Sequence, residues 1–164
     1  MRIVTYNVNG IKARLPRLIE YLAEQQPDIV CLQELKSSDE TVPEADIRAA
    51  GYGVAWHGQK GFNGVAILTR GAEPQAVRHG LAGDPEDSHS RYIEARVGDI
   101  VVASLYLPNG NPQPGPKFDY KLAWMERLAA RAAELLAQEV PVVLAGDYNV
   151  IPTRSHDDTY SVRA

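Results

Sequence analysis

The fold is decided by residues 2–33, RIVTYNVNGIKARLPRLIEYLAEQQPDIVCLQ, because three structural elements follow one another there without a break. The β-branched and apolar residues over Arg2–Val8 predict a strand. Apolar residues then recur with helical spacing at Leu15, Leu18, Ile19 and Leu22, and Pro27 ends the predicted helix. A second apolar run, Asp28–Gln33, follows at once. Strand, helix and strand in this order indicate an α/β protein.

The rest of the chain repeats these signals. Five more apolar runs bounded by turn residues predict strands at Tyr52–His57, Gly64–Thr69, Tyr92–Val97, Ile100–Leu107 and Val140–Gly146. A second helical stripe consists of Leu122, Met125, Leu128, Ala129, Ala132, Leu135 and Leu136, and a short helix is predicted over Glu44–Ala50. Gly61–Gly64 and Asp84–Ser90 are typical of turns or exposed loops. Because some strands are joined by helices and others by short connections, we expect a mixed β-sheet with flanking helices.

The composition is that of one ordinary globular domain. Of the 164 residues, 45% are apolar and 23% are charged, and this length supports one hydrophobic core. The net charge of -4 argues against binding nucleic acid over the whole surface, but it is compatible with a local basic rim. No apolar stretch is long enough to span a membrane and no signal sequence precedes the first strand, so we expect a cytoplasmic protein. The single cysteine, Cys31, lies in an apolar run and is predicted to be buried.

Polar side chains follow three of the predicted strands. They are Asn7 and Asn9 after the first strand, Glu34 after the second, and Asp147 with Asn149 after the last. The carboxyl ends of strands form one rim in α/β sheets, so residues distant in sequence converge there. Carboxylate and amide oxygens suit Mg²⁺ or Mn²⁺ rather than zinc. Each residue alone is more typical of a turn or a helix cap, and the spacing also allows a nucleotide-binding or carbohydrate-binding domain.

Five segments carry further information. They are YNVNGIKAR at Tyr6–Arg14, LQELK at Leu32–Lys36, GVAIL at Gly64–Leu68, YLPNG at Tyr106–Gly110 and GDYN at Gly146–Asn149. In this order they resemble the signatures of the exodeoxyribonuclease III and apurinic endonuclease family, within the endonuclease/exonuclease/phosphatase superfamily. The resemblance implies a DNA-repair phosphodiesterase that cleaves 5′ to abasic sites and removes nucleotides or blocking groups from 3′ ends.

The same resemblance assigns roles to individual residues. It implies that Glu34 binds Mg²⁺ or Mn²⁺ directly with Asn7 beside it, and that Asp147 and Asn149 line the same metal site. Tyr106 would face the phosphate, while Asp147 assists proton transfer and Asn149 stabilises the charged transition state. These three are the expected catalytic residues.

The implied partner is double-stranded DNA with abasic sites or 3′ ends. By the resemblance Arg91 touches DNA, and Lys12, Arg14 and Asn9 are the other expected contacts. For Arg91, Lys12 and Arg14 an equally good interpretation is that they are solvated surface cations. Neither a membrane nor an obligate protein partner is expected.

The resemblance covers only the amino-terminal half of the family's four-layered α/β/β/α sandwich. The second half provides another aspartate and a terminal Asp-His pair, and the segment Ser155-His156-Asp157 has the wrong order to match it. We therefore expect residues 1–164 to be an incomplete endonuclease/exonuclease/phosphatase domain that requires the missing half. Two interpretations stay open: another phosphoesterase of the superfamily, acting on inositol phosphates, sphingomyelin or RNA, and a non-catalytic fragment.

Several predicted strands carry apolar residues at successive positions. Val4–Val8, Ile29–Leu32, Val65–Leu68 and Val142–Ala145 have this pattern, which is typical of a sheet covered on both faces. Because the two long helices can cover only one face, we expect the other face to be an exposed apolar surface. The isolated chain should then aggregate, dimerise or bind a hydrophobic dye, and should cut abasic DNA negligibly.

Overall fold

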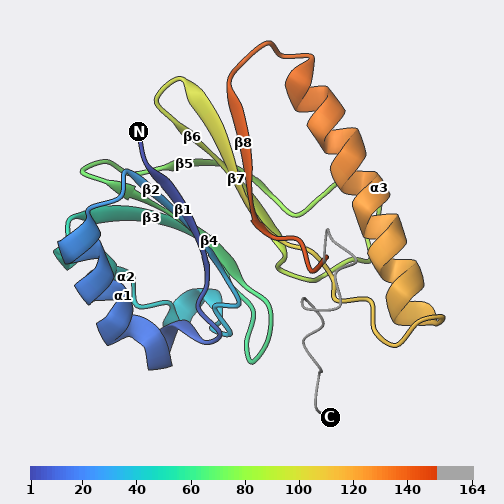
Figure 1. Ribbon diagram of the computed structural model, residues 1–164, viewed down its shortest axis with the longest axis horizontal. Coiled ribbons are helices and arrows are strands. Elements are labelled where there is room, and N and C mark those ends of the chain that lie inside the picture. Colours follow the sequence, from blue (N-terminus) through green and yellow to red (C-terminus); the bar gives the residue numbers. More distant parts are fainter. Residues whose placement is uncertain (151–164) are drawn as a thin grey trace, which may run out of the picture.

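The computed structural model describes residues 1–150, which form two β-sheets with helices on the outside (Figure 1). The predicted segment Ser155-His156-Asp157 lies outside the described residues. The elements are β1 (Ile3–Asn7), α1 (Ile11–Gln25), β2 (Ile29–Gln33), the 3-10 helix η1 (Asp39–Thr41), α2 (Glu44–Ala49), β3 (Tyr52–His57), β4 (Val65–Arg70), β5 (Gln75–His79), β6 (Tyr92–Val97), β7 (Ile100–Tyr106), α3 (Pro116–Leu136) and β8 (Val142–Asp147).

Both sheets are mixed, as predicted, and each contains one parallel pair. The first sheet has the order β1-β2-β4-β3, and the second has the order β5-β6-β7-β8. Helix α1 connects the parallel strands β1 and β2, whereas α3 connects the parallel strands β7 and β8. The remaining neighbours are antiparallel. A helix is needed only where the chain must return to start a parallel strand, so the connections follow the predicted pattern.

The expectation of one sheet with an open apolar face is wrong, because the strands form two sheets that cover each other. On β2, Ile29 and Cys31 point into the space between the sheets, where they join a cluster that includes Ile93 and Val102 of the second sheet. The alternate residues of β2, including Val30, pack with the helices on the outer face. Continuous apolar runs therefore arise from burial on both faces, and the four layers are α/β/β/α.

The outer face of the second sheet is covered by α3. Trp124 and Leu128 of this helix pack with Tyr92 and Leu105 of the sheet. The predicted stripe is wrong in part, because Leu122, Met125 and Leu136 are exposed whereas Lys121, Trp124, Leu128 and Leu135 are buried. The buried face is thus rotated by about one residue from the most apolar face, and a lysine occupies it.

Some exposed apolar side chains lie on or near strands β1 and β8, among them Tyr6 and Tyr148. Strands β1 and β8 are edge strands of their sheets and lie next to each other (Figure 1). Every residue of β8 is half-buried, unlike the nearly fully buried β2. Other exposed apolar side chains, such as Phe62 and Val77, lie elsewhere, so the exposed apolar groups of the described residues are scattered rather than gathered on one sheet face.

Strand β5 and Cys31 are the remaining features to set against the sequence predictions. Strand β5 was not predicted, because Gln75–His79 contains few apolar residues and lies at a sheet edge where most of its residues are exposed. Cys31 is buried as predicted, and burial raises the pKa of its thiol to about 12. Among the helices within residues 1–150, none has both the length and the apolar composition needed to cross a membrane.

Candidate active site

The carboxyl ends of the two parallel strand pairs meet at one edge of the sandwich. In the first sheet Asn7 is in register with Gln33, so Glu34 follows beside it. In the second sheet Tyr106 is in register with Asp147. Gly146 permits this pairing to be close, because a Cβ atom there would lie 2.0 Å from the carbonyl oxygen of Leu105. Residues more than a hundred positions apart are thus brought into contact.

Asn7 joins the acidic side chains of the two sheets. Its Nδ2 donates to Glu34 Oε1 at 2.9 Å and to Asp147 Oδ2 at 3.0 Å. Its Oδ1 accepts the backbone N–H of Asn9 at 3.1 Å, which fixes the orientation of the amide. Asn7 therefore presents its donors to the carboxylates, and it holds two negative groups together that would otherwise repel each other.

Glu34 is the most heavily hydrogen-bonded acid at this edge. Besides Asn7, it accepts the Tyr106 hydroxyl at 2.8 Å and forms an ion pair with Lys36 at 3.0 Å. Burial would raise the pKa of Glu34, but the hydrogen bonds from Asn7, Lys36 and Tyr106 outweigh it and lower that pKa. Burial and the bond to Glu34 raise the pKa of Tyr106 to about 12. Near neutral pH, Glu34 is ionised and Tyr106 is a hydrogen-bond donor.

The oxygens around Glu34 fit a hard cation. Lys36 places its ammonium against both Glu34 Oε2 and Asn9 Oδ1, so these oxygens already converge on one positive charge. Carboxylate and amide oxygens are the ligands that Mg²⁺ and Mn²⁺ prefer. An open depression of about 420 Å³ is lined by Asn7, Asp147 and Asn149. Within residues 1–150, no three His, Cys, Asp or Glu side chains cluster as a metal site, so the acidic donors are the pair Glu34 and Asp147.

Asn149 is held next to Asp147 by a tight turn. Its backbone N–H donates to Asp147 Oδ1 at 3.0 Å, and its side-chain Nδ2 donates to the carbonyl oxygen of Leu107 at 2.7 Å. Its φ of 48° lies in the left-handed region, which asparagine tolerates better than most residues. The amide oxygen of Asn149 thus has a fixed position beside the carboxylate.

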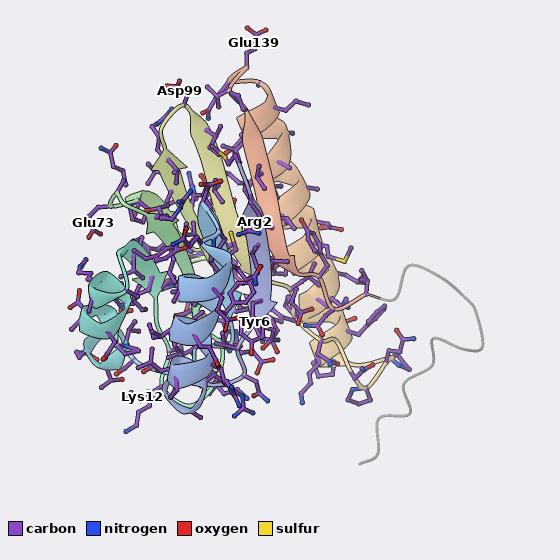
Figure 2. The ribbon with its side chains drawn as sticks, turned by 60° about the vertical axis from the view of Figure 1, so that its left-hand side comes forward. Arg2, Tyr6, Lys12, Glu73, Asp99 and Glu139 are labelled. Carbon is purple, nitrogen blue, oxygen red and sulfur yellow. The ribbon has the colours of Figure 1, made fainter. Side chains whose placement is uncertain are left out.

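The predicted DNA contacts fall into two groups. Arg91 lies with its guanidinium 4.9 Å from the centre of the Tyr106 ring, and its Nη1 donates to the Tyr106 carbonyl oxygen at 3.2 Å. Asn9 is also part of the site through Lys36. In contrast, Lys12 and Arg14 are exposed on the first turns of α1, and Figure 2 shows Lys12 pointing away from the body of the protein. The structure therefore brings Arg91 and Asn9 to the site, but not Lys12 or Arg14.

The sequence interpretation assigned no role to three polar side chains that lie at or near the site. Lys36 lies in the LQELK motif, so its closeness to Glu34 could have suggested an ion pair. Gln33 donates to Ser104 Oγ at 3.1 Å and links the two sheets beneath the site. Lys121 of α3 donates to the carbonyl oxygen of Asn149 at 2.7 Å. In the sequence, the position of Lys121 is indicated only by its spacing: it precedes Trp124 by three residues and Leu128 by seven, which places all three on one face of the helix.

The endonuclease/exonuclease/phosphatase family model matches residues 4–158. The chain belongs to this family. Exodeoxyribonuclease III of Haemophilus influenzae is 34% identical to it over 161 residues, which cover 93% of the chain and 59% of that relative. DNA repair nuclease APEX1 of Danio rerio is 31% identical, over 92% of the chain and 49% of that relative. The sequence resemblance to exodeoxyribonuclease III over an amino-terminal portion is confirmed.

Solved structures of the family show the same fold. A 3′ phosphatase from Neisseria bound to a product DNA hairpin has a TM-score of 0.90 and 38% identity, covering 94% of the chain and 60% of that structure. An AP endonuclease from Archaeoglobus fulgidus has a TM-score of 0.83 and 40% identity, with 94% and 59% covered. These family members are thus longer than the chain, which spans about 59% of the first of the curated relatives.

Proposed function

We propose that the protein is a DNA-repair phosphodiesterase of the exodeoxyribonuclease III type that uses Mg²⁺ or Mn²⁺. It cleaves 5′ to abasic sites and removes nucleotides or blocking groups from 3′ ends. The observation that carries this proposal is the bridge of Asn7 to both Glu34 and Asp147, which joins the two sheets at one acidic edge. Cytoplasmic location stays a prediction. The relatives are longer than this chain, so the activity is proposed for the whole catalytic unit of the family.

In this proposal Glu34 holds the cation, with Asn7, Asp147 and Asn149 lining the site. Asn9 adds an amide oxygen close to Glu34. The cation, when bound, would neutralise the negative charge that develops on the scissile phosphate. Glu34 suits this role because its lowered pKa keeps it ionised near neutral pH.

The remaining chemistry is assigned to Asp147 and Asn149, which line the depression, and to Tyr106, which is hydrogen-bonded to Glu34. Asp147 transfers a proton at the attacking water or the leaving oxygen, and the amide of Asn149 stabilises charge on the phosphate. Tyr106 stays protonated because its pKa is raised, so its hydroxyl can donate to a phosphate oxygen once Glu34 engages the cation. All three groups are positioned by hydrogen bonds before a substrate arrives.

DNA would reach this site along a local basic rim rather than a basic surface. Arg91 beside Tyr106 is the proposed contact nearest to the scissile phosphate, with Asn9 on the other side of Glu34. We propose Lys12 and Arg14, which are exposed on α1, as contacts with more distant phosphates. The net charge of -4 means that these few cations determine where DNA can approach.

The test is a substrate panel. End-labelled duplexes with an abasic-site analogue, a 3′ phosphate or an intact strand are incubated with the whole catalytic unit and Mg²⁺, Mn²⁺ or a chelator, and the 164-residue chain alone is assayed in parallel. Inositol phosphate, sphingomyelin and RNA are included, since they represent other phosphoesterases of the superfamily. We expect metal-dependent incision or 3′ trimming of DNA, which Asp147→Asn reduces by at least about a hundredfold.

The matched control is Asp99→Asn. Asp99 lies in the exposed turn between β6 and β7, at the opposite end of the molecule from Lys12 (Figure 2). This variant loses the same charge and should keep the activity of the original protein. Preferential hydrolysis of a non-DNA substrate would refute the proposed substrate, and metal-independent incision would refute the proposed role of the acidic edge.

A further inference from the structure

Helix α3 carries a buried lysine that the proposed chemistry does not use. Lys121 is only 8% exposed and lies on the same face of α3 as Trp124 and Leu128, which pack on the second sheet. A lysine seldom takes such a position unless its ammonium has polar partners, because burial disfavours the charge. The contacts of its side chain therefore indicate what it does.

The ammonium of Lys121 connects the two loops that follow β7 and β8. Its Nζ donates to the carbonyl oxygen of Asn149 at 2.7 Å and to that of Asn109 at 3.2 Å. The aliphatic part of the side chain packs on Gly110, where a Cβ atom would lie 2.6 Å from Lys121 Cδ. Gly110 also has a φ of +80°, so only glycine meets both conditions without strain. The space for the lysine is thus built into the loop.

These contacts complete the restraint on Asn149. Its N–H is bound by Asp147, its side-chain Nδ2 by Leu107, and its carbonyl oxygen by Lys121. The first of these bonds also orients the carboxylate of Asp147, because it fixes Oδ1 while Asn7 fixes Oδ2. Removal of the ammonium would leave the half-buried carbonyl of Asn149 without its charged donor and would loosen the turn.

We infer that Lys121 is a positioning residue that fixes Asn149, and through it the carboxylate of Asp147, for phosphodiester hydrolysis. Its hydrogen bonds go to backbone carbonyl oxygens and not to the carboxylates of Glu34 or Asp147. It therefore acts by holding the backbone of two loops against the start of α3. The inference rests on the proposed function for its catalytic consequence. Its structural consequence, the restraint of the Asn149 backbone by Lys121, can be measured without any substrate.

The experiment compares Lys121→Met with Leu128→Ala. Methionine keeps the length and the apolar packing but removes the donor, whereas Leu128→Ala destabilises α3 two turns away without removing a hydrogen bond to either loop. Native-state hydrogen exchange measured by NMR should show the Asn149 amide exchanging about tenfold faster in Lys121→Met, after correction for global stability. In Leu128→Ala this amide should change only as the global stability does.

Kinetics on abasic duplex DNA provide the second readout. We expect Lys121→Met to lower kcat about tenfold while KM stays within about twofold, because the residue organises catalytic groups and does not bind DNA. Leu128→Ala should retain kcat at a temperature where it is folded. Unchanged exchange at Asn149 in Lys121→Met, or a similar loss of kcat in both variants, would overturn the inference.

A third variant covers the case in which Lys121→Met does not fold. Lys121→Arg keeps the positive charge, but its planar, longer guanidinium cannot reproduce the two bonds that the compact ammonium makes to the carbonyl oxygens of Asn109 and Asn149. We expect faster exchange at Asn149 here too, and wild-type protection in this variant would overturn the inference. If the unmodified whole catalytic unit does not cleave DNA with Mg²⁺ or Mn²⁺, the proposed function fails, whereas the exchange data still decide whether Lys121 restrains Asn149.

Discussion

Replacement of Glu94 by glutamine should loosen α3 from the second sheet. Glu94 on β6 is fully buried and receives two hydrogen bonds from Arg131 of α3, at 2.7 and 2.8 Å. The Tyr92 hydroxyl donates a third bond at 2.7 Å. Glutamine has nearly the same shape, but it removes the negative charge and turns one acceptor into a donor. Arg131 would then keep a mostly buried charge without its partner.

The expected loss is about 3 kcal/mol of the free energy of unfolding. Removal of one partner from a buried ion pair costs roughly 3–5 kcal/mol. The lower end applies because the Arg131 side chain is 15% exposed and keeps a second ion pair, at 2.7 Å, with the exposed Glu134. A domain of this size is stable by only about 5–15 kcal/mol, so the loss is large. It corresponds to a decrease in melting temperature of roughly 6–12 °C.

Urea unfolding followed by tryptophan fluorescence measures this loss, because Trp124 of α3 is buried against the second sheet. The control is Glu20→Gln, which removes an acid paired with Arg17 at the same distance of 2.7 Å but on the exposed surface. Its unfolding midpoint should not move. A double variant with Glu94→Gln and Arg131→Met should lose less than the sum of the single losses, because neither charge remains unpaired. A loss below about 1 kcal/mol for Glu94→Gln, or strict additivity, would refute the reasoning.

Three further predictions concern the candidate site and the same ion pair. Glu34→Gln should weaken Mn²⁺ binding by at least about a hundredfold in a calorimetric titration, since an amide lacks the charge that attracts a hard cation, while the exposed Glu24→Gln should bind normally. Asp147→Asn and Asn149→Ala should each reduce kcat far more than they change KM, and their combined effect should be much less than additive if both act on one phosphate. Burial would raise the pKa of Glu94, but Arg131 and Tyr92 outweigh it and lower that pKa. The stability that Glu94 contributes is therefore complete above its ordinary pKa and is lost as the pH falls through the lowered value, so acid unfolding curves of the original protein and Glu94→Gln should converge at low pH.

The strands and helices were largely predictable because their signals are local. Seven apolar runs became strands, and the helix ended by Pro27 became α1. Which strands share a sheet was not predictable in this way. Val30 and Cys31 are adjacent and equally apolar, yet one packs under α1 and the other contacts the second sheet. An apolar run records that both faces are buried but not what covers each face, which explains the incorrect expectation of an open sheet.

For the candidate site, the residues that meet could be predicted, but the hydrogen bonds between them could not. Strand ends and motifs predicted that Asn7, Glu34 and Asp147 would meet, and the structure places them in one hydrogen-bonded chain. That Asn7 turns its donors to both acids could not be predicted, because this orientation follows from the Asn9 N–H that binds its oxygen in the folded chain. Likewise, only the folded chain shows which lysine is near which oxygen.

Lys36 and Lys121 illustrate why the partner of a side chain cannot be predicted from the sequence. Both are lysines near acidic or polar loops in the sequence, but one lies against a carboxylate and the other against two carbonyl oxygens. A divalent cation at Glu34 would compete with the ammonium of Lys36, whereas it would leave the bonds of Lys121 intact. In the proposed function Lys36 would therefore respond to metal binding, and Lys121, by the inference above, would support the site with or without the metal. The two lysines differ in burial. The Lys36 side chain is 35% exposed and can move away from Glu34 into solvent, whereas Lys121 is buried on the inner face of α3.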